Sequence, residues 1–150
     1  MTHITLAVTG SISAYKAADI TSQLTKLGFE VKVLMTPSAQ KFYPPLTLQV
    51  LSKNQVGLDV MMEDDPQRIE HIDIGKETDL FLVAPASANT IAKLAMGLAD
   101  NMVTSTALAL PQTSKKLLAP AMNTKMLDHP ATQRNLEILK DFGYRIITTS

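Results

Sequence analysis

The chain has 150 residues, enough for one domain that buries roughly 70% of the surface its unfolded form exposes. Its 14 Lys and Arg residues balance 14 Asp and Glu residues, so neither nucleic acid nor an anionic membrane is expected as a partner. Cysteine is absent, which excludes thiolate metal sites and disulfides within the chain, and we expect no metal. No secretory signal precedes the first strand and no run of roughly 20 apolar residues is present, so a cytoplasmic protein is expected.

The first 35 residues predict a β-α-β unit. The apolar runs Ile4–Val8 and Val31–Met35 are typical of buried strands. Between them, the turn at residues 9–13 leads into a helix with apolar positions on one face, and Gly28 lies where a C-cap glycine belongs. Such a unit is expected to be parallel and right-handed.

The next segment predicts turns and short helices. Thr36–Ser38 starts a turn followed by a helix through Phe42, and the Pro44-Pro45 pair then starts a helix over Leu46–Leu51. Residues 53–70 have no clear pattern, although residues 62–66 include three acidic residues and indicate an exposed loop. Residues 71–75 then lead to the next strand.

The second half alternates again between strands and helices. Leu80–Ala84 predicts a buried strand ended by Pro85, followed by a helix from about Ser87 to Met96 and another helix capped at residues 100–101. Residues 116–119 predict a strand, residues 130–142 a helix and residues 144–147 a last strand. This order predicts an α/β domain: a three-layer αβα Rossmann or flavodoxin-like fold with a parallel sheet covered on both faces. The order of its strands stays open.

Four predicted strands end in small or polar residues, namely at positions 10–13, 36–38, 85–90 and 120–123. Ligands of open α/β sheets bind outside the carboxyl ends of the strands, so four such exits favour a binding site over four capped turns. The first turn lacks the later glycines of GxGxxG, and no GxxxxGK[ST] loop is present. A mononucleotide phosphate held by hydroxyl and backbone N–H groups fits better than a dinucleotide or a nucleoside triphosphate.

Several motifs then resemble a known family along essentially the whole chain. They are GSISAYK at 10–16, His71-Ile72, APASANT at 84–90, GLADN at 97–101 and APAMNTKM at 119–126. The PASANT and PAMNxxM elements at this spacing are highly specific, whereas the first loop alone is weak. The sequence closely resembles the homo-oligomeric flavin-containing cysteine decarboxylases.

The resemblance implies FMN as cofactor, a homotrimer or trimer-based assembly, and decarboxylation of 4′-phospho-N-pantothenoylcysteine to 4′-phosphopantetheine in coenzyme A synthesis. A saturated cysteine carboxylate decarboxylates poorly, and flavin acts as the electron sink. By family analogy, hydride transfer from the cysteinyl Cβ to flavin gives a thioaldehyde, carbon dioxide leaves an enethiolate, and the hydride then returns. A phosphopantothenate–cysteine ligase, fused in many relatives, is expected here as a separate protein of the same pathway.

Three residues match the family's catalytic and substrate positions. His71 matches the active-site histidine, which takes a proton as the substrate is oxidised; without the resemblance, a surface histidine after an acidic loop is the better explanation. Asn123 matches the PAMN asparagine that orients the substrate carboxylate, and it also suits a helix cap. Met126 matches a residue lining the substrate pocket, or else fills the core.

A larger set matches the flavin contacts of the family, at the phosphate, ribityl chain or ring. Its members are Gly10, Ser11, Ile12, Thr36, Ser38, Phe42, Ser87, Asn89, Thr90 and Ala121. For Phe42 a buried helix aromatic is the commoner explanation, and Asp100 with Asn101 serves either the flavin or a subunit contact.

One departure from the family lies at the C-terminus, where relatives carry a glycine-rich flap with a cysteine that assists reduction of the enethiolate. We therefore expect residues 1–150 to form a single decarboxylase domain without that flap, and, acting alone, to stall at the enethiol. Two alternatives stay open: a non-catalytic regulatory relative, and a flavodoxin-like electron carrier.

Overall fold

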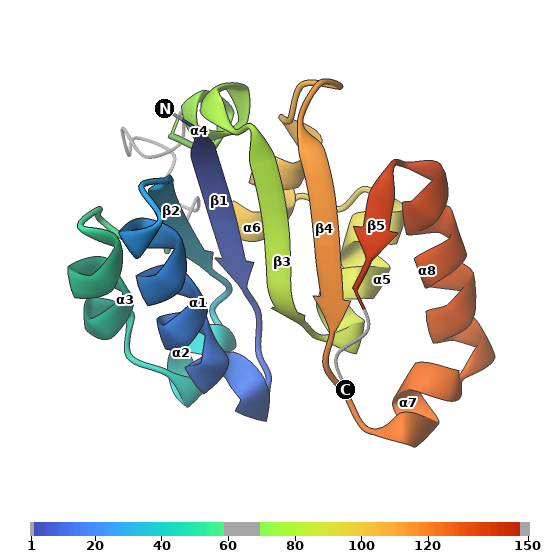
Figure 1. Cartoon of the computed structure of the whole chain (residues 1–150). Coiled ribbons are helices and arrows are strands. Elements are labelled where there is room, and N and C mark those ends of the chain that lie inside the picture. Colours follow the sequence, from blue (N-terminus) through green and yellow to red (C-terminus); the bar gives the residue numbers. More distant parts are fainter. Residues whose placement is uncertain (1, 59–69, 148–150) are drawn as a thin grey trace.

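Residues 2–58 and 70–147 are described by the structure, a computed structural model, and they contain a five-stranded parallel sheet with helices on both faces (Figure 1). The strands are β1 (His3–Val8), β2 (Glu30–Met35), β3 (Leu80–Ala86), β4 (Lys115–Pro120) and β5 (Tyr144–Ile146). Their spatial order is β2-β1-β3-β4-β5, the flavodoxin-like order: β2 is added on one side of β1, and β3, β4 and β5 are added on the other side, so the switch point lies between β1 and β3. The predicted fold class is confirmed.

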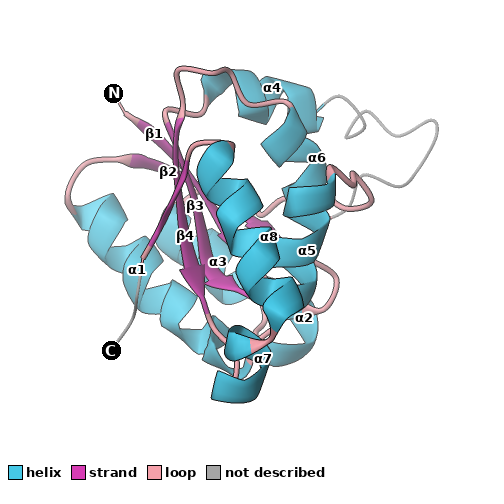
Figure 2. Ribbon diagram, turned by 90° about the vertical axis from the view of Figure 1, so that its right-hand side faces the viewer, coloured by secondary structure: helices cyan, strands magenta, loops and turns pink. Residues whose placement is uncertain are grey.

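The helices form two layers, one on each face of this sheet (Figure 2). One layer holds the short 3-10 helix η1 (Ile12–Tyr15) with α1 (Lys16–Lys26), α2 (Ala39–Phe42) and α3 (Pro45–Ser52). The other holds α4 (Glu70–Glu77), α5 (Ala88–Met96), α6 (Met102–Leu108) and α8 (Pro130–Asp141), with the short α7 (Thr124–Asp128) leading into α8. None of these helices, within the described ranges, has both the length and the apolar run needed to traverse a lipid bilayer.

Two apolar clusters hold the layers to the sheet, because successive side chains of a strand point to opposite faces. Phe81 and Val83 of β3 belong to the cluster beneath α5, α6 and α8, whereas Leu82 and Ala84 face the cluster beneath α1 and α3. The central strands are therefore apolar on both faces, which is why their sequences form continuous hydrophobic runs.

The predicted end of β3 at Pro85 is wrong. The strand continues to Ala86, and its register against β4 shifts between Val83 and Ala86. The Ala84-Pro85 peptide bond is cis. Pro85 lacks an N–H donor, but its carbonyl still accepts the N–H of Thr9, so the residue contributes to the link between β1 and β3.

Two helices lack a clear signal in the sequence. The helix α4 packs beside α6, where a Cβ on Gly75 would lie 2.9 Å from the Cβ of Ala109. The five-residue α7 begins after Asn123, and this residue is its N-cap, which is one of the two roles that the sequence suggests for Asn123. The acidic loop predicted at residues 62–66 lies outside the described residues.

Candidate functional site

The four polar strand exits meet at one edge of the sheet and are hydrogen-bonded to one another in a row. Because β2, β1, β3 and β4 are parallel neighbours, their carboxyl ends lie side by side (Figure 1). One backbone bond links each neighbouring pair of exits: Thr36 N–H to Val8 C=O at 3.1 Å, Thr9 N–H to Pro85 C=O at 3.2 Å, and Ala121 N–H to Ala86 C=O at 3.0 Å. The predicted exits therefore form one continuous row.

The loops after β1 and β2 touch at a glycine. A Cβ added to Gly10 would lie 2.5 Å from the Cβ of Ser38, closer than real Cβ contacts allow. Thr36, which is 5% exposed, accepts the N–H of Ala39 on its Oγ1 at 3.2 Å and so orders the start of α2. Only glycine at position 10 permits this close approach, and the two loops form one cradle at the sheet edge.

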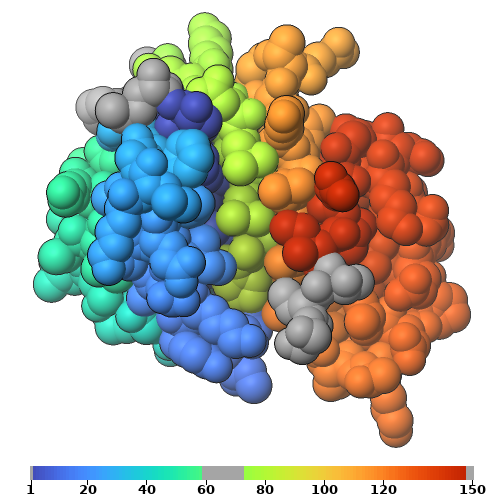
Figure 3. Space-filling model, viewed as in Figure 1, coloured from blue at the N-terminus to red at the C-terminus, as the bar shows by residue number. Residues whose placement is uncertain are grey.

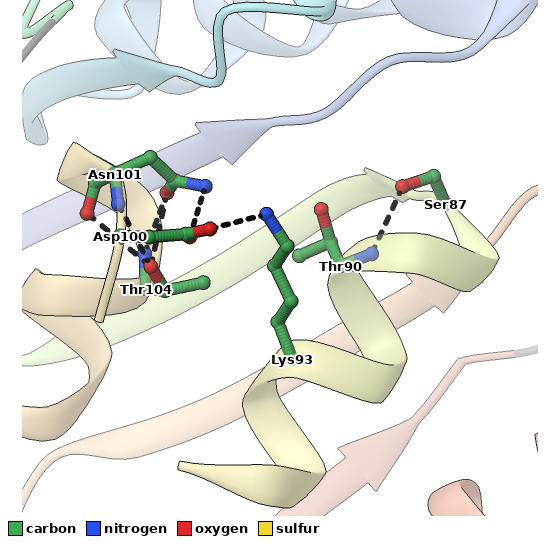
Figure 4. A network of polar contacts seen from close by, with 6 residues as sticks. All are labelled: Ser87, Thr90, Lys93, Asp100, Asn101 and Thr104. Carbon is green, nitrogen blue, oxygen red and sulfur yellow. Dashed lines mark hydrogen bonds and ion pairs between the residues drawn. The ribbon is translucent and has the colours of Figure 1, made fainter. Parts of the chain in front are cut away.

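The start of α5 forms the next part of the site (Figure 4). Ser87 is the N-cap residue, and its Oγ accepts the N–H of Thr90 at 3.2 Å. Further along the helix, Lys93 Nζ lies 2.7 Å from Asp100 Oδ2, and Asn101 with Thr104 forms a capping box at the start of α6. This network ties the loop at residues 97–101 to α5 and thereby fixes α6 relative to it.

A cavity of about 650 Å³ opens beside these exits, and Figure 3 shows the hollow between the blue first turn and the orange and red atoms of the α7–α8 region. One wall is the first turn, at residues 11–13, and the other is the exit of β4 with α7 and α8. Among the lining residues are Ser11, Ile12, Ala121, Met122, Asn123, Leu127, Gln133, Leu136 and Lys140. The cavity is thus apolar along its walls with a few polar groups, as small-molecule sites commonly are.

The two polar atoms of the Asn123 side chain, Oδ1 and Nδ2, have different roles. Its Oδ1 accepts the N–H of Met126 at 2.9 Å and caps α7, as expected of an N-cap. Its Nδ2 has no hydrogen-bond partner within the described part of the chain, and the residue lines the cavity. The amide nitrogen is therefore available to donate to a bound carboxylate while the oxygen holds the helix.

The remaining predicted residues lie at varying distances from this cavity. Ser11, Ile12 and Ala121 line it with Asn123. Gly10, Thr36, Ser38, Ser87, Asn89 and Thr90 lie at the neighbouring exits, where Thr90 is buried and Asn89 exposed. Phe42 ends α2 with 50% of its surface exposed, so it is not a buried helix aromatic. Met126 is 46% exposed, so it does not fill the core, and it is absent from the cavity lining.

Within a single chain, His71 does not lie at this site. Its backbone lies in α4, near the amino ends of the strands and therefore at the opposite end of the sheet from Asn123 (Figures 1 and 2). Its side chain lies outside the described part of the structure.

Sequence reasoning missed the contribution of α8 to the cavity. Gln133, Leu136 and Lys140 follow one another at helical spacing on one face of α8 and line the cavity together. The mixture of polar and apolar residues on one helix face was the only signal in the sequence that α8 could line a cavity. It is ambiguous without the tertiary structure, because it also fits a half-exposed surface helix.

Several known proteins are similar to this chain in sequence. A family model described as "Flavoprotein" matches residues 1–150. A probable phosphopantothenoylcysteine decarboxylase of Streptococcus mutans is 65% identical over 144 residues, which are 96% of this chain and 80% of that protein. The coenzyme A biosynthesis bifunctional protein CoaBC of Bacillus subtilis is 48% identical over 148 residues, which cover 99% of this chain but only 36% of that protein.

Solved structures show the same fold. The FMN-dependent cysteine decarboxylase TvaF of thioviridamide biosynthesis superposes with a TM-score of 0.90 at 33% identity, over 98% of this chain and 90% of the other. A cysteine-to-serine variant of PPC decarboxylase, complexed with pantothenoylaminoethenethiol, superposes with a TM-score of 0.81 at 32% identity, over 97% and 81% of the two chains. The chain therefore belongs to the flavoprotein family, and its resemblance to the flavin-containing cysteine decarboxylases is confirmed.

Proposed function

We propose that this chain binds FMN at the four strand exits and decarboxylates 4′-phospho-N-pantothenoylcysteine to 4′-phosphopantetheine. The observation that carries the proposal is the cavity beside the exits, which Asn123 lines with an amide nitrogen that has no hydrogen-bond partner among the described residues. The 65% identical relative is named a probable phosphopantothenoylcysteine decarboxylase, and this chain spans 80% of its length.

The exits fit a flavin mononucleotide on their own chemistry. The close approach of Gly10 to Ser38 brings the first two exits together at the rim, and the N-terminus of the nine-residue helix α5 is capped by the neutral Ser87. N–H groups at such a rim and helix start favour a phosphate. The residues that would hold the cofactor are Gly10, Ser11, Ile12, Thr36, Ser38, Phe42, Ser87, Asn89, Thr90 and Ala121.

When bound, FMN would supply an electron acceptor for the substrate, so that the carboxylate of a saturated cysteine can be lost as carbon dioxide while the remaining electron pair is delocalised. The chain's own residues orient the substrate and keep water away. The Nδ2 of Asn123 would donate a hydrogen bond to the substrate carboxylate, and Ile12 and Leu136 line the cavity with apolar surface. His71 would take a proton from the substrate as it is oxidised.

The place of α4 makes a second subunit part of the proposal. His71 and Asn123 lie at opposite ends of one sheet, so they act on one substrate only if His71 of one subunit meets Asn123 of another. A homotrimer with sites between subunits satisfies this requirement, and we propose that assembly. Light scattering should then give three times the 16.3 kDa mass of the chain.

The test starts with the colour of the purified protein and its FMN spectrum. A colourless protein that refuses added FMN would contradict both the decarboxylase and the electron-carrier hypotheses. The second readout is carbon dioxide release from the substrate, followed by mass analysis of the product. A yellow protein that releases no carbon dioxide would favour the electron carrier.

Asn123→Asp separates catalysis from helix capping. Aspartate also caps helices, so α7 and FMN binding should persist, whereas the donor to the carboxylate is replaced by a negative charge. We expect carbon dioxide release to fall by about 100-fold or more. If the Asn123→Asp variant released carbon dioxide as fast as the wild type, Asn123 would act only as the N-cap of α7.

Subunit mixing tests the shared site. Asn123→Asp and His71→Asn subunits, each inactive alone, should regain activity when unfolded and reassembled together, because about a quarter of the sites then combine both native residues. No recovery in mixed oligomers would contradict a site shared in this way.

We also propose that residues 1–150 form one domain, that the protein acts in the cytoplasm, and that a phosphopantothenate–cysteine ligase supplies its substrate. Fractionation of cells followed by detection of the protein tests the location. A coupled assay, in which ligase and this chain together release carbon dioxide from 4′-phosphopantothenate and cysteine, tests the order of the two reactions.

A further inference from the structure

We propose that Thr9 is a positioning residue of the FMN site, which sets the start of α5 relative to the first turn through its buried hydroxyl. The inference rests on the proposed function, because it concerns the affinity for FMN. Thr9 lies outside the motifs that the sequence singles out, immediately before Gly10.

The Thr9 hydroxyl uses both its donor and its acceptor. Thr9 is 0% exposed, its Oγ1 donates to the carbonyl of Pro85 at 2.7 Å, and the N–H of Ser87 donates to Oγ1 at 2.8 Å. The backbone N–H of Thr9 also donates to Pro85 C=O, at 3.2 Å. One side chain thus bridges two backbone groups on either side of Ala86.

These bonds lie where regular pairing between β1 and β3 has ended. The last residues paired in register are Ala7 and Val83, and Thr9 supplies three hydrogen bonds beyond them. The N–H of Ser87 belongs to an N-cap residue and has no partner within its own helix. The Thr9 hydroxyl therefore satisfies a group that the helix itself leaves unpaired.

This link matters for binding because it joins two halves of the cofactor cradle. Gly10 and Ser11 follow Thr9 directly, and the N-terminus of α5 follows Ser87. A phosphate and ribityl chain contacting both halves need a set separation between them, and preorganised groups bind more tightly than groups that must be ordered on binding. Losing the hydroxyl should therefore weaken FMN binding more than it weakens the fold.

The chain offers a matched control in the amino-terminal half of β1, the strand that precedes Thr9. Thr5 is 2% exposed, and its Oγ1 lies 2.7 Å from Oγ1 of Thr78, just before β3. Thr5→Val removes a buried hydroxyl that bonds across the same strand pair but far from the exits. Thr9→Val and Thr5→Val make the same isosteric replacement of a buried hydroxyl by a methyl group, so the two variants differ mainly in the location of the lost hydroxyl.

The experiment measures the Kd for FMN by fluorescence quenching in the apoprotein, together with Tm. We expect Thr9→Val to raise Kd by about tenfold or more, which corresponds to at least about 1.4 kcal/mol. Thr9→Ser keeps the hydroxyl and should restore binding to within about threefold of wild type. Thr5→Val should lower Tm but leave Kd within about twofold, because its bond lies away from the cradle.

Two results would overturn the inference while leaving the proposed function intact: Thr9→Val binding FMN as tightly as wild type, or Thr5→Val weakening binding as much. If Thr9→Val does not fold, Thr9→Ala decides in its place, because it removes the hydroxyl without setting a methyl group against the Pro85 carbonyl. If the wild-type protein itself binds no FMN, both the proposed function and this inference are contradicted.

Discussion

Gly10→Ala tests the contact between the first and second strand exits. The new Cβ would lie 2.5 Å from the Cβ of Ser38, about 0.9 Å inside the 3.4 Å at which ordinary contacts begin. A Cβ cannot rotate away as the end of a long side chain does, so the two loops must separate. Crowding of this kind costs about 1–3 kcal/mol.

Part of this cost is offset in the unfolded state. Alanine restricts the unfolded chain more than glycine does, which stabilises the folded protein by about 0.4–1 kcal/mol where the backbone conformation allows it. Gly10 is not among the glycines with positive φ, so the alanine meets no backbone strain. We expect a net loss of about 1–2 kcal/mol, or about 2–8 °C in Tm.

The assay is urea and thermal unfolding of four proteins: wild type, Gly10→Ala, Ser38→Gly, and the two changes combined. Removing the Ser38 Cβ leaves the Ser38 carbonyl carbon as the nearest atom, at an ordinary 3.4 Å. The double variant should therefore be more stable than the sum of the single changes predicts, by about 1–2 kcal/mol. Strictly additive effects, or a Gly10→Ala protein as stable as wild type, would refute the contact.

Two further predictions concern groups outside the cavity. Burial raises the pKa of Tyr144 above its ordinary value of about 10, so above that pH the unfolded chain loses a proton that the folded chain keeps, and stability should fall by up to about 1.4 kcal/mol per pH unit. Tyr144→Phe should lack this component in urea unfolding at about pH 9–11, and parallel curves for the two proteins would contradict it. In the polar network of Figure 4, Asn101→Ala should cost about 1–2 kcal/mol, because the capping box is buried, whereas Asp100→Asn at the half-exposed ion pair should cost less than about 1 kcal/mol. Thermal unfolding ranks the two variants, and the reverse order would argue against this assignment.

The local structure followed closely from the sequence where one physical signal dominated. The apolar runs Ile4–Val8 and Val31–Met35 are strands because continuous hydrophobic sequence suits a sheet buried on both faces. Ser87 caps α5 because its hydroxyl accepts an N–H that the helix leaves unpaired. Where signals competed, local reasoning failed: Pro85 was expected to end β3, but the register shift beside it lets the strand continue.

The sequence by itself determined that polar turns follow four strands, that these 150 residues contain no cysteine, and that the motifs match a flavin-dependent family. Only the tertiary structure decided which turns are neighbours, because the order β2-β1-β3-β4-β5 depends on contacts between residues far apart in the chain. It joined Gly10 to Ser38 and Thr9 to Ser87, and it set Asn123 beside the first turn at the cavity. It also separated His71 from Asn123, because a residue that precedes a parallel strand lies at the opposite end of the sheet from one that follows a parallel strand.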